Sequence, residues 1–574
     1  MHATCLSSKS RRPIHFGIIC DGTTFPAWQA SCLHKLLALE NVEPALLIIA
    51  NESLTASNCW QKLRDFRQLL WRLYSSFVNR SSKAARPVNM VSTLEQVPAV
   101  HCNVIRESEF SFCFGEADIA RIQEHDLDFI LHFGSGHIRG EILTAARFGV
   151  WAFHHGDEKS HLGDPPGFWE VYKRSPITGA ILRRLADQAD HIIVLRKGYF
   201  RTINTSYVRN RDIVYFDSAD WPAQVCIDIQ NGNADYVDAS PSRTSAPTFH
   251  TPNNFQVVVF LLRMMGNALY EAYDLLFFYD HWNVGIVNSP IHVFVTPGAR
   301  PQVQWLPAPA QNIFIADPFA IRRGELVHIL FEEYDYGTCK GRISTTSLNG
   351  RSSSPSRVVF DGSFHMAYPY LLEHNDQIYC IPETAEAREV GLYAAKQFPE
   401  KWEKAATLVR DYAAVDSTVF EYEGRWWLLA TDDDDGPNHK LKAWYAPHLL
   451  GPWTPHAANP IKVDIRSARP AGTPFMHESH LYRPSQDCSV TYGGRIVLNR
   501  VMRLTPTEFE EEQIAVIEPY KDSAYPDGLH TVSAVGDVTI IDGMKRAFAA
   551  KSLSVLIHKM SRIRFRLDAF LHRR

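Results

Sequence analysis

Five short segments in the C-terminal half of the chain share one pattern, and their spacing restricts the fold more than any other feature. They are Ala316-Asp317-Pro318-Phe319, Ala367-Tyr368-Pro369-Tyr370, Val415-Asp416-Ser417, Gly472-Thr473-Pro474-Phe475 and Leu529-His530-Thr531. Their middle residues lie 51, 48, 57 and 57 positions apart. A period of about 50 residues with several short strands in each unit is typical of radial β-sheet repeats. The spacing therefore predicts an all-β five-bladed propeller.

Four of the five segments are followed by a polar turn and then an apolar strand, as in Arg323-Gly324 and Glu423-Gly424. Such turns join antiparallel strands. If each middle residue opens the innermost strand of its blade, one axial funnel is surrounded by Asp317, Tyr368, Asp416, Thr473 and His530.

Two of these residues, Asp317 and Asp416, place carboxyl groups toward the same funnel from blades one and three. Cleavage of a glycosidic bond needs an acid and a base on opposite sides of a sugar. The alternative is that both are turn or capping residues, because Asp is common where strands begin and end.

Length, composition and charge exclude several classes of protein. A chain of 574 residues is too long for one core, and its 45% apolar content excludes disorder. With 59 basic and 63 acidic side chains, there is no electrostatic case for binding nucleic acid. The ten cysteines form no CxxC pair, and Met1–Arg12 has no apolar core of a signal peptide, which favours a cytoplasmic location.

The C-terminal segment 551–574 differs from the rest, because it contains seven Lys or Arg residues and one acid, with apolar residues near helical spacing. A basic amphipathic helix can lie on an anionic membrane, so this tail predicts a peripheral membrane contact. The alternative is a terminal helix that docks its apolar stripe on the protein.

The N-terminal half alternates strands with helices. Strands are expected at 15–20, 44–50, 128–133 and 150–155, and helices at 28–39, 61–79, 117–125 and 141–148. This order predicts an α/β, doubly wound, Rossmann-like domain. Ligands of such folds bind at the carboxyl ends of strands, and the last strand ends in His154-His155-Gly156-Asp157.

The segments Phe133 to Ile138, Gly149 to His154, Pro165 to Trp169 and Thr178-Gly179 resemble the formyltransferase domain of methionyl-tRNA and sugar formyltransferases. The resemblance implies a catalytic His at His154, a catalytic Asp at Asp190 and formyl-tetrahydrofolate as the cofactor. The Asn of that family is replaced by Ala152. Loss of one oxyanion donor costs about 10² to 10³ in rate, so formyl transfer is expected to be weakened, altered or lost. His155 is an alternative donor, although its side chain should point to the other face of the strand. Another alternative is an inactive domain that docks or binds a sugar.

A Ser-, Pro- and Thr-rich stretch at 240–254 reads as a linker and leads into an apolar helix, 255–278. The expected divisions are a formyltransferase-like domain at 1–235, a linker with a connecting helix at 236–278, a propeller at 279–550 and the basic tail at 551–574.

The propeller half resembles furanosidase-type glycosidases and, more closely, the N-terminal domain of the glucosamine inositolphosphorylceramide transferase family. The supporting segments include His281-Trp282-Asn283-Val284-Gly285, His365 to Pro369, Ile381-Pro382-Glu383-Thr384 and Arg466 to Gly472. In the glycosidases, the first-blade Asp activates the nucleophile and the third-blade Asp positions and tunes. The resemblance implies these roles for Asp317 and Asp416.

The fourth-blade Glu of the glycosidases is missing, because Arg469-Pro470-Ala471-Gly472 stands in its place. Glu383 is the preferred general acid, and Glu478 in the blade-four hairpin is the alternative. Arg466 and Arg469 suit a phosphate-bearing donor such as a nucleotide sugar. Alternatively, Arg469 pairs with Asp317 or Asp416 and seals the funnel.

The remaining predicted substrate-binding residues are His365, Tyr368 and His530, with no metal assigned, although a central cation at the histidines is an alternative. Taken together, the sequence predicts a carbohydrate-active protein of glycan or glycolipid biosynthesis that transfers or cleaves glycosidic bonds in the funnel. One alternative is an N-formyltransferase that acts on an amino sugar, and another is a non-catalytic glycan-binding scaffold.

Overall fold

The chain divides into two compact units in a computed structural model of the protein. The model describes residues 12–52, 66–106, 111–134, 137–158, 162–188, 190–244, 248–350, 352–549 and residue 555. Unit 1 comprises Met1–Asn267, and unit 2 comprises Ala268–Arg574. The division falls inside the segment 236–278 that was expected to connect two domains. The basic tail at 551–574 lies outside the described residues apart from Val555, and so does the start of the helix expected at 61–79.

Unit 1 is built on one ten-stranded sheet. Its strands, in spatial order, are β13 (Ser242–Arg243), β12 (His191–Arg201), β11 (Ile177–Leu185), β9 (Val150–His154), β7 (Phe129–His132), β1 (Ile14–Cys20), β3 (Val42–Glu52), β5 (Ala99–Arg106), β6 (Ser111–Phe114) and β8 (His137–Arg139). Two short pairs lie outside it, β2 (Thr24–Pro26) with β4 (Pro87–Asn89) and β10 (Leu162–Gly163) with β14 (Thr248–Phe249).

The centre of this sheet is parallel and its flanks are mixed. The neighbours β9, β7, β1, β3 and β5 pair in parallel, whereas β11 is antiparallel to both β9 and β12, and β6 is antiparallel to β5. The predicted α/β alternation is therefore confirmed for the central strands, which read as apolar runs because helices cover both faces of a parallel sheet. The sheet as a whole is mixed rather than a simple doubly wound one.

Of the four helices predicted for unit 1, the described residues contain three, near 28–39, 61–79 and 117–125, and the other helices of the unit were not predicted. The helices are α1 (Ala27–Leu37), α3 (Leu69–Ser81), α4 (Val91–Leu94), α5 (Glu116–Gln123), α6 (Phe168–Lys173), α7 (Tyr207–Ser218) and α8 (Trp221–Asn231), and α9 (Asn254–Phe277) runs across the boundary between the units. The helix expected at 141–148 is only the 3-10 turn η1 (Glu141–Thr144). Left-handed glycines bracket this segment, with Gly140 at φ 83° and Gly149 at φ 69°, and leave no room for a longer helix before β9.

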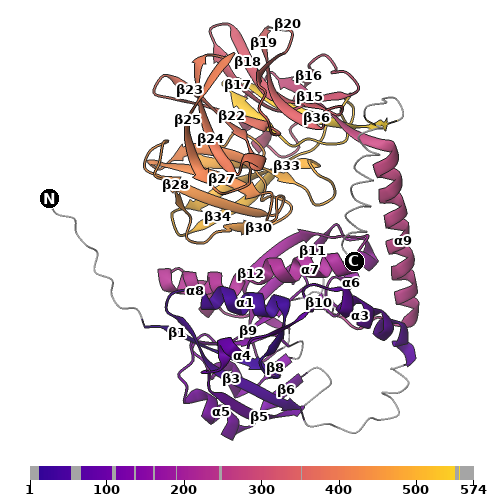
Figure 1. Cartoon of the computed structure of the whole chain (residues 1–574), viewed down its shortest axis with the longest axis vertical. Coiled ribbons are helices and arrows are strands. Elements are labelled where there is room, and N and C mark those ends of the chain that lie inside the picture. Colours follow the sequence, from indigo (N-terminus) through magenta and orange to yellow (C-terminus); the bar gives the residue numbers. More distant parts are fainter. Residues whose placement is uncertain are drawn as a thin grey trace, which may run out of the picture. The chain divides into compact units, whose positions relative to one another are not determined.

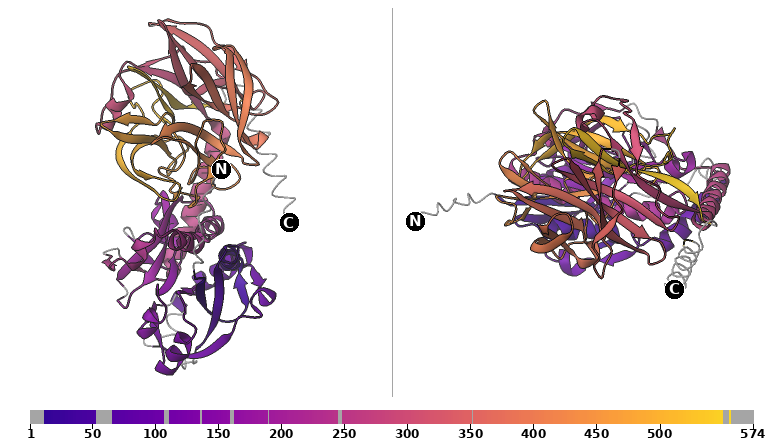
Figure 2. Two further views of the ribbon diagram at one scale, coloured as in Figure 1. Left: turned by 90° about the vertical axis from the view of Figure 1, so that its left-hand side faces the viewer. Right: turned by 90° about the horizontal axis from the view of Figure 1, so that it is seen from above.

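Unit 2 contains five antiparallel sheets, which confirms the predicted five-bladed propeller. Blade one is β17 (Ile313–Arg323), β18 (Leu326–Asp335), β19 (Lys340–Asn349), β20 (Ser352–Ser353) and β21 (Arg357–Phe360); blade two is β22 (Ala367–His374), β23 (Gln377–Glu383), β24 (Glu389–Gln397) and β25 (Lys401–Arg410). Blade three is β26 (Ala414–Tyr422), β27 (Arg425–Asp432), β28 (Lys440–Ala446), β29 (Thr454–Pro455) and β30 (Lys462–Val463); blade four is β31 (Phe475–His477), β32 (His480–Asp487), β33 (Arg495–Leu504) and β34 (Phe509–Ile517). Figure 1 shows the sheets around one centre, and Figure 2 shows the same unit from two further directions.

The fifth blade joins the two ends of the propeller. Its sheet contains β35 (Val532–Val535) and β36 (Val538–Phe548) from the C-terminal side, with β15 (Phe278–Val287) and β16 (Val303–Trp305) from the N-terminal side. The antiparallel ladder between β15 and β36 runs from Phe278 opposite Phe548 to Val287 opposite Thr539. This pairing closes the ring, so that the edges of the first and last strands are covered.

The predicted repeat has a backbone cause in three of the blades. Asp317, Tyr368 and Asp416 lie in β-bulges of the innermost strands β17, β22 and β26, with φ of 52°, 43° and 52°. The sequence predicted that they open these strands, but Asp317 and Asp416 lie inside β17 and β26, and Tyr368 is the second residue of β22. A bulge turns one side chain out of the regular alternation. The repeated bulge therefore directs one residue of each of these three blades toward the axis.

No helix within the described residues is long and apolar enough to cross a membrane.

Candidate functional site in the propeller

A cavity of about 260 Å³ lies in unit 2, and carboxyl groups from two blades line it. Its lining residues are Trp282, Phe314, Asp317, Glu332, Tyr334, Tyr336, His365, Ala367, Glu383, Arg469, Tyr492 and His530. The cavity is small beside the roughly 300–1,000 Å³ of drug-sized sites, and aromatic rings form much of its wall. Such walls suit the apolar face of a single sugar ring.

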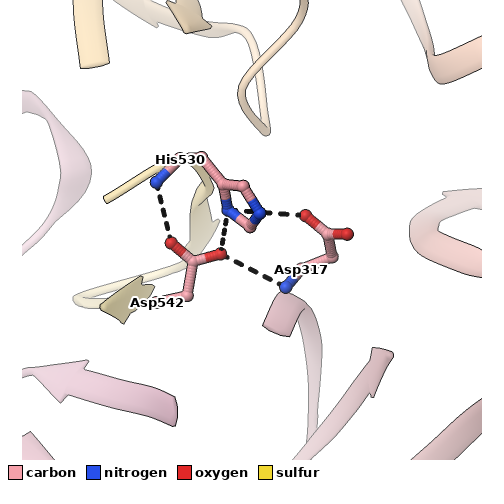
Figure 3. Close-up of side chains that lie close together, drawn as sticks. All are labelled: Asp317, His530 and Asp542. Atoms are coloured by element: carbon pink, nitrogen blue, oxygen red, sulfur yellow. Dashed lines mark hydrogen bonds and ion pairs between the residues drawn. The ribbon is translucent and has the colours of Figure 1, made fainter. Parts of the chain in front are cut away.

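Asp317 belongs to a buried cluster with His530 and Asp542. The His530 Nδ1 atom lies 2.5 Å from Asp542 Oδ2 and 3.7 Å from Asp317 Oδ1, so the imidazole stands between two carboxylates (Figure 3). Asp542 Oδ1 also accepts the backbone N–H groups of His530 and Thr531, at 2.9 and 3.1 Å. Asp542 is thereby fixed as the residue that orients the imidazole.

Burial and the neighbouring charges shift the pKa values of Asp317 and His530. Burial raises the pKa of Asp317 to about 6, although the charge of His530 opposes the shift. Burial alone would lower the pKa of His530, but Asp542 and Asp317 outweigh it and raise that pKa to about 9. At neutral pH the imidazole is therefore a cation and Asp317 is mostly ionised. The three side chains have the donor atoms of a metal site, within 4.8 Å of one another.

Two glutamates occupy equivalent positions in blades one and two. Glu332 is opposite Ala316 in the ladder between β17 and β18, and Glu383 is opposite Ala367 in the ladder between β22 and β23. Burial, together with the nearby aspartates, holds the pKa of both well above the ordinary range of Glu. Both carboxyl groups therefore hold their protons to a higher pH than an ordinary Glu, which suits a proton donor.

The two glutamates differ in what holds them. Glu383 Oε2 accepts the backbone N–H of Asp416 at 3.3 Å, and its side chain is half-buried. Glu332 is 6% exposed, and its Oε1 lies 3.6 Å from His365 Nε2. Because His365 Nδ1 accepts the N–H of Gly341 at 2.9 Å, its Nε2 carries the proton and faces Glu332. Burial lowers the pKa of His365, which keeps this imidazole neutral.

Asp416 lies behind the cavity wall in a buried ion pair. Arg469 donates from Nε to Asp416 Oδ2 at 2.6 Å and from Nη2 to Oδ1 at 3.3 Å, and Gln486 donates to Oδ2 at 2.8 Å. The remaining guanidinium contacts are with Asn438 and Tyr492. The alternative in which Arg469 pairs with Asp416 is therefore the observed one, and protein partners occupy four of the five guanidinium N–H groups.

Two other predicted substrate-binding residues lie outside the cavity lining. Arg466 pairs with Asp464 through two bonds of 2.7 and 2.8 Å. Tyr368 is fully buried, and its hydroxyl accepts the N–H of Gly472 at 2.7 Å. The bulged, left-handed Tyr368 is thus held by a backbone contact to blade four, which is a structural role.

The predicted site of unit 1 has a different character. Ala152 is 3% exposed and packs among the apolar side chains of the sheet, so the position of the missing Asn has no hydrogen-bond donor. His154 ends β9, whereas Asp190 precedes β12 and accepts bonds from Arg243 Nε at 2.8 Å and His191 at 2.9 Å. These bonds lower the pKa of Asp190, His191 contributing most. His155 is buried against Trp28 and Tyr215, and burial lowers its pKa to about 3.

Several site residues were missed by sequence reasoning, and one of them had a readable signal. Glu332 follows Asp317 by 15 positions, as Glu383 follows Tyr368 by 15 and Thr431 follows Asp416 by 15. Extending the repeat to its second strand would have found Glu332. Trp282 stacks on His530, with ring centroids 4.0 Å apart. Trp282 lies on β15 and Asp542 on β36, and the repeat does not predict the residues of these closing strands.

The comparisons with known proteins concern mainly the propeller. Residues 302–530 match the family model described as Glucosamine inositolphosphorylceramide transferase 1, N-terminal. A protein of that name from Oryza sativa subsp. japonica is 36% identical over 205 residues, which are 34% of this chain and 27% of the relative. The chain thus spans about a quarter of the length of this curated relative.

Two solved structures are also similar in part. A glycosyl hydrolase from Bacteroides ovatus has 10% identity and a TM-score of 0.30, and covers 40% of this chain and 83% of its own. A sugar N-formyltransferase from Shewanella has 12% identity and a TM-score of 0.25, and covers 44% of this chain and 87% of its own.

The sequence similarity to the glucosamine inositolphosphorylceramide transferase 1 N-terminal family runs from β16 through the cavity residues to His530.

Proposed function

We propose that the propeller cavity binds one neutral or amino sugar unit of a glycan or glycolipid, and that Asp317 and Glu383 act on its glycosidic bond. The observation that carries the proposal is that Asp317 and Glu383, from neighbouring blades, line one aromatic-walled cavity in which burial raises the pKa of Glu383 well above its ordinary range. A base and an acid that face one small site are the requirement of glycosyl transfer. The matched family model and the name of the relative support a glycolipid as substrate.

In the proposed reaction Asp317 and Glu383 each transfer one proton. Asp317 takes the proton of the incoming hydroxyl, whose oxygen forms the new bond to the anomeric carbon. Glu383 gives its proton to the oxygen that leaves the same carbon. The incoming hydroxyl belongs to a sugar or lipid acceptor in a transfer and to water in a hydrolysis. Asp416, fixed by Arg469, holds Glu383 through its backbone N–H and so has a positioning role.

Glu383 is the stronger candidate for the acid because it is half-buried, whereas Glu332 is almost fully enclosed and already faces His365. Glu383→Gln should lower turnover about 10² to 10⁴-fold, the usual contribution of a general acid. Glu332→Gln is the matched control and should have a smaller effect on kcat than on KM. A larger kcat loss in the Glu332 variant would transfer the role of the acid to that residue.

The charge of the cavity selects the sugar. The charged cluster comprises Asp317, Arg469 and His530 in the cavity lining, with Asp416 and Asp542 directly behind it. These three aspartates and two cations sum to one negative charge, which disfavours an anionic sugar and accommodates an ammonium group. Binding should be tested by ligand-observed NMR with glucose, glucosamine, glucuronate and glucose 1-phosphate. The proposal expects saturation transfer from the first two only, and a preference for the two anions would contradict it.

Turnover should depend on pH in a stated direction. It should rise as pH increases through about 6, where Asp317 loses its proton, and fall at a higher pH, where Glu383 ionises. A kcat/KM profile measured on wild type and Glu383→Gln separates the two limbs. Retention of the alkaline limb in the Gln variant would exclude Glu383 as its source.

We do not propose formyl transfer for unit 1. Ala152 is packed in the core and supplies no oxyanion donor, and Asp190 is bonded to Arg243 and His191. The non-catalytic scaffold is the outcome that remains if sugars bind in the cavity and no turnover of any glycoside is detected.

A further inference from the structure

Helix α3 in unit 1 has three chemically different sides. One side packs in the protein, where Val78 is buried in a cluster with Phe168 and Tyr207. A second side exposes the large apolar side chains of Leu70 at 37%, Leu73 at 63% and Phe77 at 61%, and Phe66, three positions before the helix, is 72% exposed. Their spacing of i, i+4, i+7 and i+11 places them in one row along the helix.

The start of α9 lies beside this row and extends it (Figure 1). Asn254 Oδ1 accepts the N–H of Leu70 at 3.0 Å, and Asn254 Nδ2 donates to the carbonyl of Phe66 at 2.8 Å. While Phe260 is buried, the outer side of α9 exposes Phe255 at 73%, Val258 at 43%, Leu262 at 56% and Met265 at 56%.

This outer side of α9 carries no charge. Arg263 is the one charged residue in 254–267, and its guanidinium donates to the carbonyl of Tyr172 and lies over the ring of that residue. A continuous group of exposed Phe, Leu, Val and Met side chains on two adjacent helices is more than a monomeric soluble domain ordinarily presents to water.

The third side of α3 borders a basic pocket of about 610 Å³. The pocket is lined by three arginines with small polar and apolar residues, namely Arg72, Arg80, Arg86, Ser75, Ser76, Asn79, Ala85 and Pro87. Its lining contains no acidic residue. Guanidinium groups bind phosphate oxygens with matched geometry, and serine and asparagine add further donors.

We propose that α3 and the first turns of α9 form an interfacial membrane-binding surface. The exposed apolar side chains enter the outer part of an anionic bilayer, and the arginine pocket binds the phosphate of a lipid headgroup. An apolar row beside a row of arginines on one helix is the arrangement of helices that lie in the plane of a membrane interface. The arginine-lined pocket favours an anionic bilayer over a protein partner as the occupant, because phosphates are dense at the depth where the apolar row ends. This surface is separate from the segment 551–574 and does not depend on the chemistry of the propeller.

The test is co-sedimentation of the full-length protein with vesicles of phosphatidylcholine, with and without about a third phosphatidylserine. Wild type should bind the anionic vesicles with a partition coefficient more than about tenfold higher than for phosphatidylcholine alone. The variant L73S/F77S should lower this coefficient by about tenfold or more per side chain, because less apolar area is buried in the membrane. R80Q/R86Q should lower it about fivefold per arginine and weaken its salt dependence. The control M476S/M502S replaces two side chains of unit 2 that are 56% and 52% exposed, and it should bind as wild type does.

Three results would overturn the proposal: no binding of wild type, equal binding of wild type and L73S/F77S, or a dimer of the lipid-free protein that L73S/F77S converts to a monomer. The last result would assign the surface to a second copy of the chain. If L73S/F77S fails to fold, hydrogen exchange on the unaltered protein decides the matter. Vesicles should slow exchange in peptides that cover 66–81 and 254–267, and protection confined to other peptides would contradict the proposal.

Discussion

The raised pKa of Asp317 makes a quantitative prediction about stability. An increase from 3.8 to about 6 on folding corresponds to about 3 kcal/mol at neutral pH, since one pKa unit is about 1.4 kcal/mol. The folded protein holds this proton more tightly than the unfolded chain, so wild-type stability contributed by Asp317 is lost as pH rises from about 4 to about 6. Asp317→Asn has no proton to lose. The stability of the variant relative to wild type should therefore increase by about 2 kcal/mol over that pH interval.

Urea unfolding of both proteins across this interval provides the measurement. His530 has a folded pKa of about 9 and stays protonated at these pH values, so the loss of its Asp317 partner adds only a constant offset to the curves. Asp522→Asn, an exposed aspartate in the same unit, is the control and should show no pH-dependent difference. A difference between Asp317→Asn and wild type that is constant with pH, or that shrinks as pH rises, would refute the reasoning.

Two further predictions concern the packing around the cavity. Arg469→Gln leaves Asp416 buried without its cation and should cost about 3–5 kcal/mol, whereas Arg466→Gln breaks a half-exposed pair with Asp464 and should cost at most about 1 kcal/mol. Equal decreases in the free energy of unfolding, measured with urea, would show that the buried ion pair stabilises the fold no more than the half-exposed pair does. Gly472→Ala should cost about 3 kcal/mol or more, because φ is 121° and a Cβ would lie 1.8 Å from the Val532 carbonyl oxygen. Gly536→Ala, at φ 66° with open space around it, should cost about 1 kcal/mol, and thermal unfolding compares the two.

The propeller could be predicted from sequence because its cause is local. Blades one, two and three repeat a bulge, a hairpin turn and an apolar strand, which recur together at Asp317, Tyr368 and Asp416. The same bulge explains why the innermost strands aim one side chain at the axis. What the period did not specify is whether that side chain reaches the cavity, and Tyr368 is instead tied to Gly472.

The candidate site was predicted in part. One cavity is lined by five of the predicted residues, namely Asp317, Glu383, His365, Arg469 and His530. The partners that set their charge were not predictable, because contacts between distant parts of the chain bring them together.

Asp542 reaches His530 from the closing strand β36, and Gln486 reaches Asp416 from the neighbouring blade four. A phosphate role for Arg469 was a reasonable inference from residue type. In the structure the guanidinium pairs with Asp416, at 2.6 Å.

In unit 1 the periodicity located the strands β1, β3, β7 and β9 and three of the helices, yet it could not locate the exposed surfaces. Leu73 and Phe77 have the spacing of core residues, and only the fold shows that they lie outside. Apolar spacing identifies one side of a helix, but it does not indicate whether protein or solvent covers that side.

The central claim is that the propeller cavity acts on a glycosidic bond through Asp317. Mass spectrometry of products is the most direct test, with nucleotide-activated hexose and hexosamine donors, inositolphosphorylceramide acceptors, and glycosylated forms of those lipids in water. The account predicts a glycosyl-transfer or hydrolysis product with wild type and with His154→Ala, and none with Asp317→Asn. A product that Asp317→Asn still forms, or that only His154→Ala abolishes, would contradict it.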